Sequence, residues 1–230
     1  SREPSMRITT INVQGLSQAL KWRELEEWLR LVSPDVAVLQ ETRLEANETN
    51  RWLLGGHLKM SNIRRGYRGV GIWVRPGLTW THTIVTPGHI MHATISVEGK
   101  EWHVIGVYIP PESLYDHIED VPVPGDLTVV AGDFNSTLGP LDAPSERHRG
   151  QASRRFQAWA RDCDLTDTWR MVHPESREFT SQRGQGNRVD FVLCSRDLVT
   201  SVTRSDMGPA VVGDHRTITT TWSETRSTFS

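Results

Sequence analysis

Short apolar runs alternate along the chain with polar loops that contain glycine, asparagine or aspartate. Most of the runs are rich in β-branched residues, which is typical of buried strands. From this pattern we predict strands at residues 6–11, 36–39, 70–74, 93–97, 102–108, 127–131, 189–193 and 217–222. Two further runs, residues 179–182 and 188–191, are separated by five residues and predict a hairpin with a loop at 183–187.

Two segments have the 3.6-residue spacing of amphipathic helices. The first runs from Ser17, a candidate N-cap, to Val32, and the second begins near Ser153. Their apolar faces consist of Leu25, Trp28, Leu29 and Val32 in the first and Phe156, Trp159, Ala160 and Cys163 in the second. Many strands with a few interspersed helices predict a layered α/β (α+β) sandwich.

Composition adds limits to this picture. The 230 residues are 37% hydrophobic and 23% charged, as in ordinary globular domains. No repeat or linker divides them, so we expect one domain at 6–224, a linker or remnant at 1–5 and a tail at 225–230. Two cysteines, a polar start and no long apolar run predict a nuclear or intracellular protein that is neither secreted nor inserted in a membrane.

The charge balance has one unusual feature. The formal net charge is -2, which argues against wrapping of nucleic acid by bulk positive charge. Of the 26 basic residues, however, all but Lys21, Lys59 and Lys100 are arginine. Arginine binds phosphate through two parallel donors, but a GC-rich genome would also encode many arginines without selection for binding. We expect the isolated domain to be a monomer, and at this near-neutral charge any binding to nucleic acid should be weak and salt-sensitive.

Polar side chains stand at the ends of the apolar runs or inside them, where charge is costly unless it is paired or bound to a cation. Taken singly, each has an ordinary explanation as a turn former, a helix cap or a core residue. Together they form six sites with the residue types that phosphate chemistry needs. These sites are Asn12, Glu41, Tyr108, Asp133 with Asn135, Asp190, and Asp214 with His215.

The oxygen-rich side chains among them suit a hard cation. Glu41 with Asn12, and Asp190 as a further candidate, match the preference of Mg²⁺ for carboxylate and amide oxygens. Asp133 is placed to orient and deprotonate a water, and Asn135 to hold the phosphate or that water. We expect Asp214 to tune His215, which supplies the titratable or positively charged group opposite the phosphate oxygens.

These motifs resemble, in order, those of the endonuclease/exonuclease/phosphatase superfamily, from about residue 9 to residue 217. The resemblance implies a four-layered αββα sandwich of the deoxyribonuclease-I-like type with its site at one rim. It also implies Glu41 as principal metal ligand with Asn12 beside it, Asp133 and Asn135 at the attacking water, and Tyr108 and His215 at the phosphate. Asp214 would support His215, and Asp190 would lie close by.

A second set of motifs is similar to the endonuclease domain of LINE-type non-LTR retrotransposons. It includes Leu138 and Asp142 after the Gly-Asp-Phe-Asn run, residues 164–170, His173-Pro174 and Phe179-Thr180. By this resemblance Thr180 and loop 183–187 would face DNA. Three positions depart from the pattern: Gly213 replaces a usual serine, Ala143 replaces a basic residue, and Gln14 replaces the acid or asparagine of the abasic-repair branch.

Two arginine clusters are candidates for phosphate contacts, with a solvated surface as the alternative. Arg64, Arg65, Arg68 and Arg75 surround Tyr67, and residues 143–161 hold Arg147, Arg149, Arg154, Arg155 and Arg161 against Glu146. The residues we expect to contact nucleic acid are Arg64, Arg68, Thr180, Arg183, Asn187 and Arg188.

The resulting hypothesis is a Mg²⁺-dependent endonuclease, with Mn²⁺ as a substitute, that nicks one strand of double-stranded DNA and leaves a 3′-hydroxyl to prime reverse transcription. The implied partners are a reverse transcriptase domain in the same parent polypeptide and the element RNA. One alternative is an abasic-site repair endonuclease or a phosphatase or phosphodiesterase for small substrates. Another is an idle scaffold, but that would predict loss of Asp133, Asn135 or His215, and all three are present. One metal or two remains open.

Overall fold

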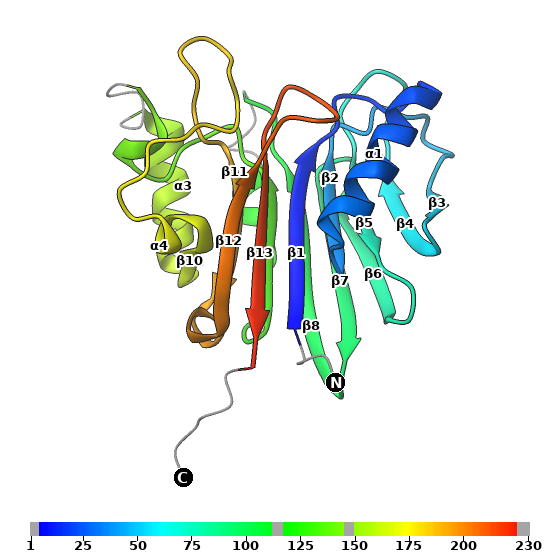
Figure 1. The fold of residues 1–230 in the computed structure, drawn as a ribbon. Coiled ribbons are helices and arrows are strands. Elements are labelled where there is room, and N and C mark those ends of the chain that lie inside the picture. The colour runs from blue at the N-terminus through cyan, green and yellow to red at the C-terminus, as the bar shows by residue number, and fades with distance from the viewer. Residues whose placement is uncertain (1–4, 112–116, 145–149, 225–230) are drawn as a thin grey trace.

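The computed structural model describes residues 5–111, 117–144 and 150–224. Two mixed β-sheets pack face to face, as Figure 1 shows. The first sheet has the order β12-β13-β1-β2-β5-β4-β3 and the second β10-β11-β9-β8-β7-β6. Within them β1 and β2 are parallel, as are β8 and β9, and the other neighbours are antiparallel.

The strands of the first sheet are β1 (Ser5–Asn12), β2 (Val36–Gln40), β3 (Asn50–Leu53), β4 (Gly56–Ser61), β5 (Val70–Val74), β12 (Val202–Gly208) and β13 (Thr217–Ser223). Those of the second are β6 (Thr79–Thr86), β7 (Ile90–Val97), β8 (Lys100–Tyr108), β9 (Thr128–Asp133), β10 (Leu165–Asp167) and β11 (Asp190–Ser195). The α-helices within the described residues are α1 (Ala19–Val32), α3 (Gln151–Asp162) and α4 (Thr168–Val172). Short 3-10 helices are η1 (Ile118–Asp120), η2 (Pro140–Asp142) and η4 (Arg196–Ser201).

Three apolar clusters account for a four-layered arrangement. One fills the space between the sheets, with Ile8, Val38 and Val104 fully buried. A second joins Trp22 and Leu25 of α1 to the outer face of the first sheet. The third joins helix α3 to the outer face of the second sheet, where the rings of Phe134 and Phe156 stack with centroids 4.5 Å apart. The predicted αββα sandwich is therefore confirmed.

Several predicted elements need correction. Helix α1 begins at Ala19 instead of Ser17, and Gln18 stands at its N-cap without a side-chain capping bond. The predicted hairpin at 179–191 reduces to a single bridge between Ser181 and Asn187, because β11 pairs with β9 and β10 instead. Strands β3, β4, β6, β10 and β12 were not predicted, and neither was α4.

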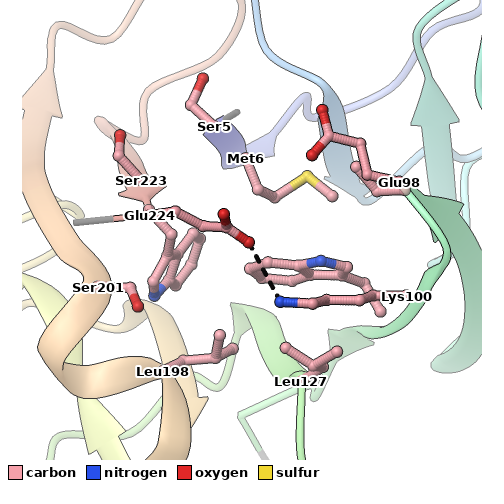
Figure 2. Close-up of a pocket in the computed structure, with 12 residues that line it drawn as sticks. Ser5, Met6, Glu98, Lys100, Leu127, Leu198, Ser201, Ser223 and Glu224 are labelled. Atoms are coloured by element: carbon pink, nitrogen blue, oxygen red, sulfur yellow. Dashed lines mark hydrogen bonds and ion pairs between the residues drawn. The ribbon is translucent and has the colours of Figure 1, made fainter. Parts of the chain in front are cut away.

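The two ends of the sandwich differ in character. Strands β1, β2, β8 and β9 end at one rim, and β11 and β13 begin there. At the opposite end, Ser5 and Glu224 line a small cavity of about 100 Å³ together with the rings of Trp102 and Trp222. Figure 2 shows this cavity and the ion pair, 3.1 Å long, that Lys100 and Glu224 form there. In the described parts of the chain, no helix has both the length and the apolarity to cross a membrane.

Candidate active site

The rim brings together the polar residues that follow or begin six strands. Asn12 ends β1, Glu41 follows β2, Tyr108 ends β8 and Asp133 ends β9. Asp190 begins β11 and lies opposite Asp133 in the antiparallel register. A Cβ at Gly132 would lie 1.9 Å from the carbonyl oxygen of Val107, so glycine permits the close approach of β8 to β9 just before Asp133.

Asn12 lies between two carboxylates. Its Nδ2 donates to Oδ2 of Asp133 at 2.9 Å and also to Oε2 of Glu41. Its Oδ1 accepts the backbone N–H of Gln14 at 3.1 Å. The amide therefore presents its nitrogen to both acids and offsets part of their mutual repulsion. To ligate a cation through Oδ1, Asn12 would have to turn its amide over.

His215 is hydrogen-bonded to Asp190, which the sequence placed only close by, whereas the carboxylate of Asp214 acts on His215 through its charge alone. The Nδ1 of His215 lies 2.8 Å from Oδ2 of Asp190, and both side chains are buried. Asp214 is exposed, and its Oδ1 lies 3.8 Å from the Nε2 of His215. Its carboxylate instead accepts a hydrogen bond from Gln14.

The buried charges shift two protonation equilibria at the rim. Burial, reinforced by the negative charge of Asp190, raises the pKa of Asp133 to about 7. Burial alone would lower the pKa of His215, but the charge and hydrogen bond of Asp190, helped by Asp133 and Asp214, raise it to about 10. His215 is therefore an imidazolium at neutral pH, suited to donate to anionic phosphate oxygens.

Tyr108 and Asn135 complete the predicted set. Burial, with Glu41 and Asp133 nearby, raises the pKa of Tyr108, so its hydroxyl stays protonated and can donate. The backbone N–H of Asn135 donates to Oδ1 of Asp133 at 2.9 Å, and its Nδ2 donates to the carbonyl of Ile109 at 2.7 Å. Asn135 thus fixes the orientation of the Asp133 carboxylate.

The donor set fits a hard divalent cation. Ligand atoms of Asp133, Asp190 and His215 lie within 4.8 Å of one another. The Oδ1 atom of Asp190 is buried and has no hydrogen-bond partner among the described residues. Glu41 adds a carboxylate beside them whose side chain is only 12% exposed and which is also paired with Arg43 at 2.6 Å. Clustered carboxylates with an oxygen left unpartnered are the arrangement that a bound cation would stabilise.

Two of the predicted DNA contacts were wrong. Arg188 is fully buried, and its guanidinium is paired with Asp142, at 2.8 Å, and with Asp167. Thr180 is also fully buried, and its hydroxyl accepts the backbone N–H groups of Val189 and Asp190. Both residues support the chain that leads into Asp190, and neither faces solvent where DNA could reach it.

The arginine cluster around Tyr67 does not form one patch. Arg75 follows the other end of β5 and pairs with Asp35 at 2.5 Å. The guanidinium groups of Arg64 and Arg68 stack on the Tyr67 ring, 4.1 and 4.6 Å from its centroid. In the second cluster Arg155 pairs with Glu119, while Arg147, Arg149 and Glu146 lie outside the described residues.

The loop at 182–186 rises from the same rim. The Ser181–Asn187 bridge closes it, and Arg183 in the loop is exposed. Glycine is required at position 186, where φ is +86° and a Cβ would lie 2.9 Å from the Phe179 ring. The loop is therefore held at its base and presents Arg183 to solvent, while Asn187 is half-buried.

Some residues at the rim were missed. Arg43 pairs with Glu41, and both residues have positive φ outside any strand, so their spacing of two gave no signal of the contact. His89 stacks on His117 at 4.4 Å and faces Nη1 of Arg68 at 2.9 Å. Its Nδ1 faces the carbonyl of Pro87, so a neutral ring with the proton on Nδ1 satisfies both contacts. No motif in the sequence pointed to His89.

Comparisons with known proteins agree with this geometry. The Endonuclease/Exonuclease/phosphatase family matches residues 9–215. A transposon TX1 protein of 149 kDa from Xenopus laevis is 24% identical over 93% of the chain, which spans only 18% of that relative. The AP endonuclease LMAP from Leishmania major superposes with a TM-score of 0.79, at 18% identity, over 96% of this chain and 88% of that one. The endonuclease domain of TRAS1, a telomere-specific non-LTR retrotransposon, gives 0.74 at 16% identity over 96% and 99%. The chain therefore belongs to the Endonuclease/Exonuclease/phosphatase family of hydrolytic enzymes.

Proposed function

We propose that the protein is a Mg²⁺-dependent DNA endonuclease that nicks one strand of a duplex and leaves a 3′-hydroxyl. The observation that carries this proposal is the facing pair of groups at the rim. On one side Asn12 bridges Glu41 and Asp133, and on the other Asp190 holds a protonated His215. Such a site places carboxylate oxygens, which can hold a cation and accept a proton, opposite an imidazolium that can donate hydrogen bonds to phosphate oxygens.

Each residue of the site has a distinct role in this scheme. Asp133, fixed by Asn12 and Asn135, accepts the proton of the attacking water. His215 and the Tyr108 hydroxyl donate to the phosphate oxygens. Glu41 is the principal candidate to hold Mg²⁺, with Asn12, Asp133 and Asp190 around it. When bound, the cation would neutralise charge on the phosphodiester, and Mn²⁺ would substitute for it.

The retrotransposon setting rests on similarity. The chain resembles part of a transposon protein and the endonuclease domain of a non-LTR retrotransposon. We infer that it acts beside a reverse transcriptase domain and the element RNA, with the new 3′-hydroxyl as primer, in the nucleus or elsewhere inside the cell. An abasic-site endonuclease is the second candidate, because an AP endonuclease shares the fold over most of both chains.

Nicking of supercoiled plasmid in Mg²⁺ tests the proposal. We expect relaxed circles with the wild type and a loss of about 10²- to 10⁴-fold in Asp133→Ala and His215→Ala. Extension of the nicks by a polymerase without prior phosphatase treatment would report the 3′-hydroxyl. Equal relaxation by all three proteins would contradict the site assignment. Cleavage confined to an abasic duplex would favour the second candidate, and release of phosphate from small esters alone would favour a phosphatase.

A further inference from the structure

The loop between β12 and β13 delivers His215 to the site, and Gln14 grips this loop at two points. Oε1 of Gln14 accepts the backbone N–H of Asp214 at 2.7 Å. Its Nε2 donates to Oδ1 of Asp214 at 2.5 Å. Both halves of one amide are thus used on a single residue, the one that directly precedes His215.

The glycine before Asp214 makes this grip sterically possible. A Cβ at Gly213 would lie 2.8 Å from Oε1 of Gln14 and 2.9 Å from the carbonyl oxygen of Asn12. Real Cβ contacts are essentially never that short, so any other residue would displace the loop or the Gln14 side chain. Gly213 and Gln14 therefore form a matched pair.

The residue before the glycine is also anchored. Nζ of Lys21, on α1, donates to the carbonyl oxygens of both Val13 and Val212. The Val212 side chain is buried in the apolar cluster beneath α1. Val212 is thus bonded to α1, and Asp214 to the segment that follows β1, immediately before His215 meets Asp190.

We propose that Gln14 is a positioning residue that latches the loop through Asp214 and so fixes His215 against Asp190. Asp214 is the receiving half of this latch and does not act on the substrate itself. The kinetic part of this inference rests on the proposed endonuclease activity, whereas its structural part does not. Because the latch acts on the loop and not on DNA, its loss should lower kcat and leave KM nearly unchanged.

The test uses a polarity swap between the two partners. Gln14→Ala removes the latch, and Gln14→Glu places a carboxylate against that of Asp214 without a donor between them. In Gln14→Glu/Asp214→Asn, the new asparagine can donate to the new glutamate, so both hydrogen bonds return with unchanged net charge. Gln18→Ala, an exposed glutamine at the N-cap of α1, is the matched control.

Two readouts are needed. Hydrogen exchange of a peptide covering residues 209–216 reports the Asp214 N–H, and plasmid or short-duplex nicking reports kcat and KM. We expect both single variants to exchange faster at this peptide and to lose about 10- to 100-fold in kcat, the scale of a small misplacement of a catalytic group. The swap should restore slow exchange and most of kcat. Gly213→Ser should behave like Gln14→Ala.

Several outcomes would overturn the latch. Unchanged exchange and kcat in Gln14→Ala would show that the loop is fixed without it. Restored exchange without restored kcat in the swap would show that the Asp214 carboxylate itself takes part in the reaction. A rise in KM alone would assign Gln14 to DNA binding. If the wild type does not nick DNA, the proposed function fails, and the exchange measurements still decide whether the latch exists.

Discussion

Two buried charge clusters, centred only two residues apart in the chain, are balanced in different ways. Around Arg188, two arginines meet two acids: Arg188 pairs with Asp142 and Asp167, and Arg170 adds a second bond to Asp142. Burial alone would lower the pKa of Arg188, but the two acids raise it above its ordinary value. Charge and hydrogen bonds are matched there, so this cluster can be a permanent part of the structure.

The cluster around Asp190 is not balanced. Asp133 and Asp190 share His215 as a buried cation, and one oxygen of Asp190 finds no partner among the residues described. Burial, and after it the negative charge of Asp190, raises the pKa of Asp133, because His215 and the hydrogen bonds compensate its charge only in part. A buried charge is therefore expected to be reactive where its compensation is incomplete, not merely where it is buried.

The largest expected effect is on catalysis at the unbalanced cluster. Asp190→Asn keeps a polar atom near His215 but removes the negative charge that stabilises the protonated form of His215. We expect nicking to fall by about 10²- to 10⁴-fold, with a fall in the pKa that governs the alkaline side of the pH–rate profile. Single-turnover rates from about pH 6 to pH 10 would measure both. An unshifted profile would show that Asp190 does not set the charge of His215.

The next effect is on stability at the balanced cluster. Arg188→Met, similar in length, removes the cation that pairs with Asp167 and leaves Asp142 with Arg170 as its remaining partner. We expect a loss of about 3–5 kcal/mol in the free energy of unfolding, measured by urea denaturation. Arg196→Met removes an exposed pair with Asp164 and is the control, with an expected loss of about 1 kcal/mol or less. Equal losses would mean that burial does not distinguish the two pairs.

A smaller effect links the unbalanced cluster to pH. Since the pKa of Asp133 is raised to about 7, the metal-free folded state loses stability as pH rises from about 4 to 7. His215, raised to about 10, contributes stability that is complete below about pH 6.5 and is lost toward pH 10. Mg²⁺ should replace the proton, so its increment in Tm should be larger at about pH 8 than at about pH 5.5. The same increment at both pH values, or an undiminished difference in Asp133→Asn, would contradict this.

The smallest effect concerns the choice of nicking site. Arg183→Ala should redistribute nicks along a mapped duplex, because an exposed arginine on a glycine-bearing loop can enter a narrow minor groove. The total rate should stay within about threefold, since the substitution leaves the catalytic groups in place. Arg196→Ala, next to the opposite end of β11, is the control. An unchanged nick map would remove Arg183 from site selection.

Much of the fold followed from the apolar pattern. Strand β5 was predicted with its observed bounds, because all five of its residues are buried and no polar residue interrupts it. Strand β6 was missed because it is an edge strand whose residues are mostly exposed. Threonines occupy four of its eight positions, so the alternation of apolar and polar residues that marks a half-buried strand is absent. Helix α4 has five residues, too few for a helical period to show.

The site was predicted in its membership more than in its contacts. The strand ends that meet at one rim follow from topology, so Asp133 and His215 could be found from sequence. The partner of Arg188 could not, because Asp142 lies 46 residues earlier in the chain. Asp214 was expected to support His215 because it is the preceding residue, but the hydrogen-bond partner of His215 is Asp190, which lies 25 residues earlier in the chain.

Ser5 and Glu224, beside the cavity in Figure 2, leave the sandwich at the end opposite the reactive rim. Polypeptide fused to either residue would therefore start about the full length of a strand away from Asp133. Since Ser5 and Ser223 are direct partners across β1 and β13, both tethers would also leave from nearly the same point. The attachment points for further polypeptide and the candidate active site would thus lie at opposite ends of the domain.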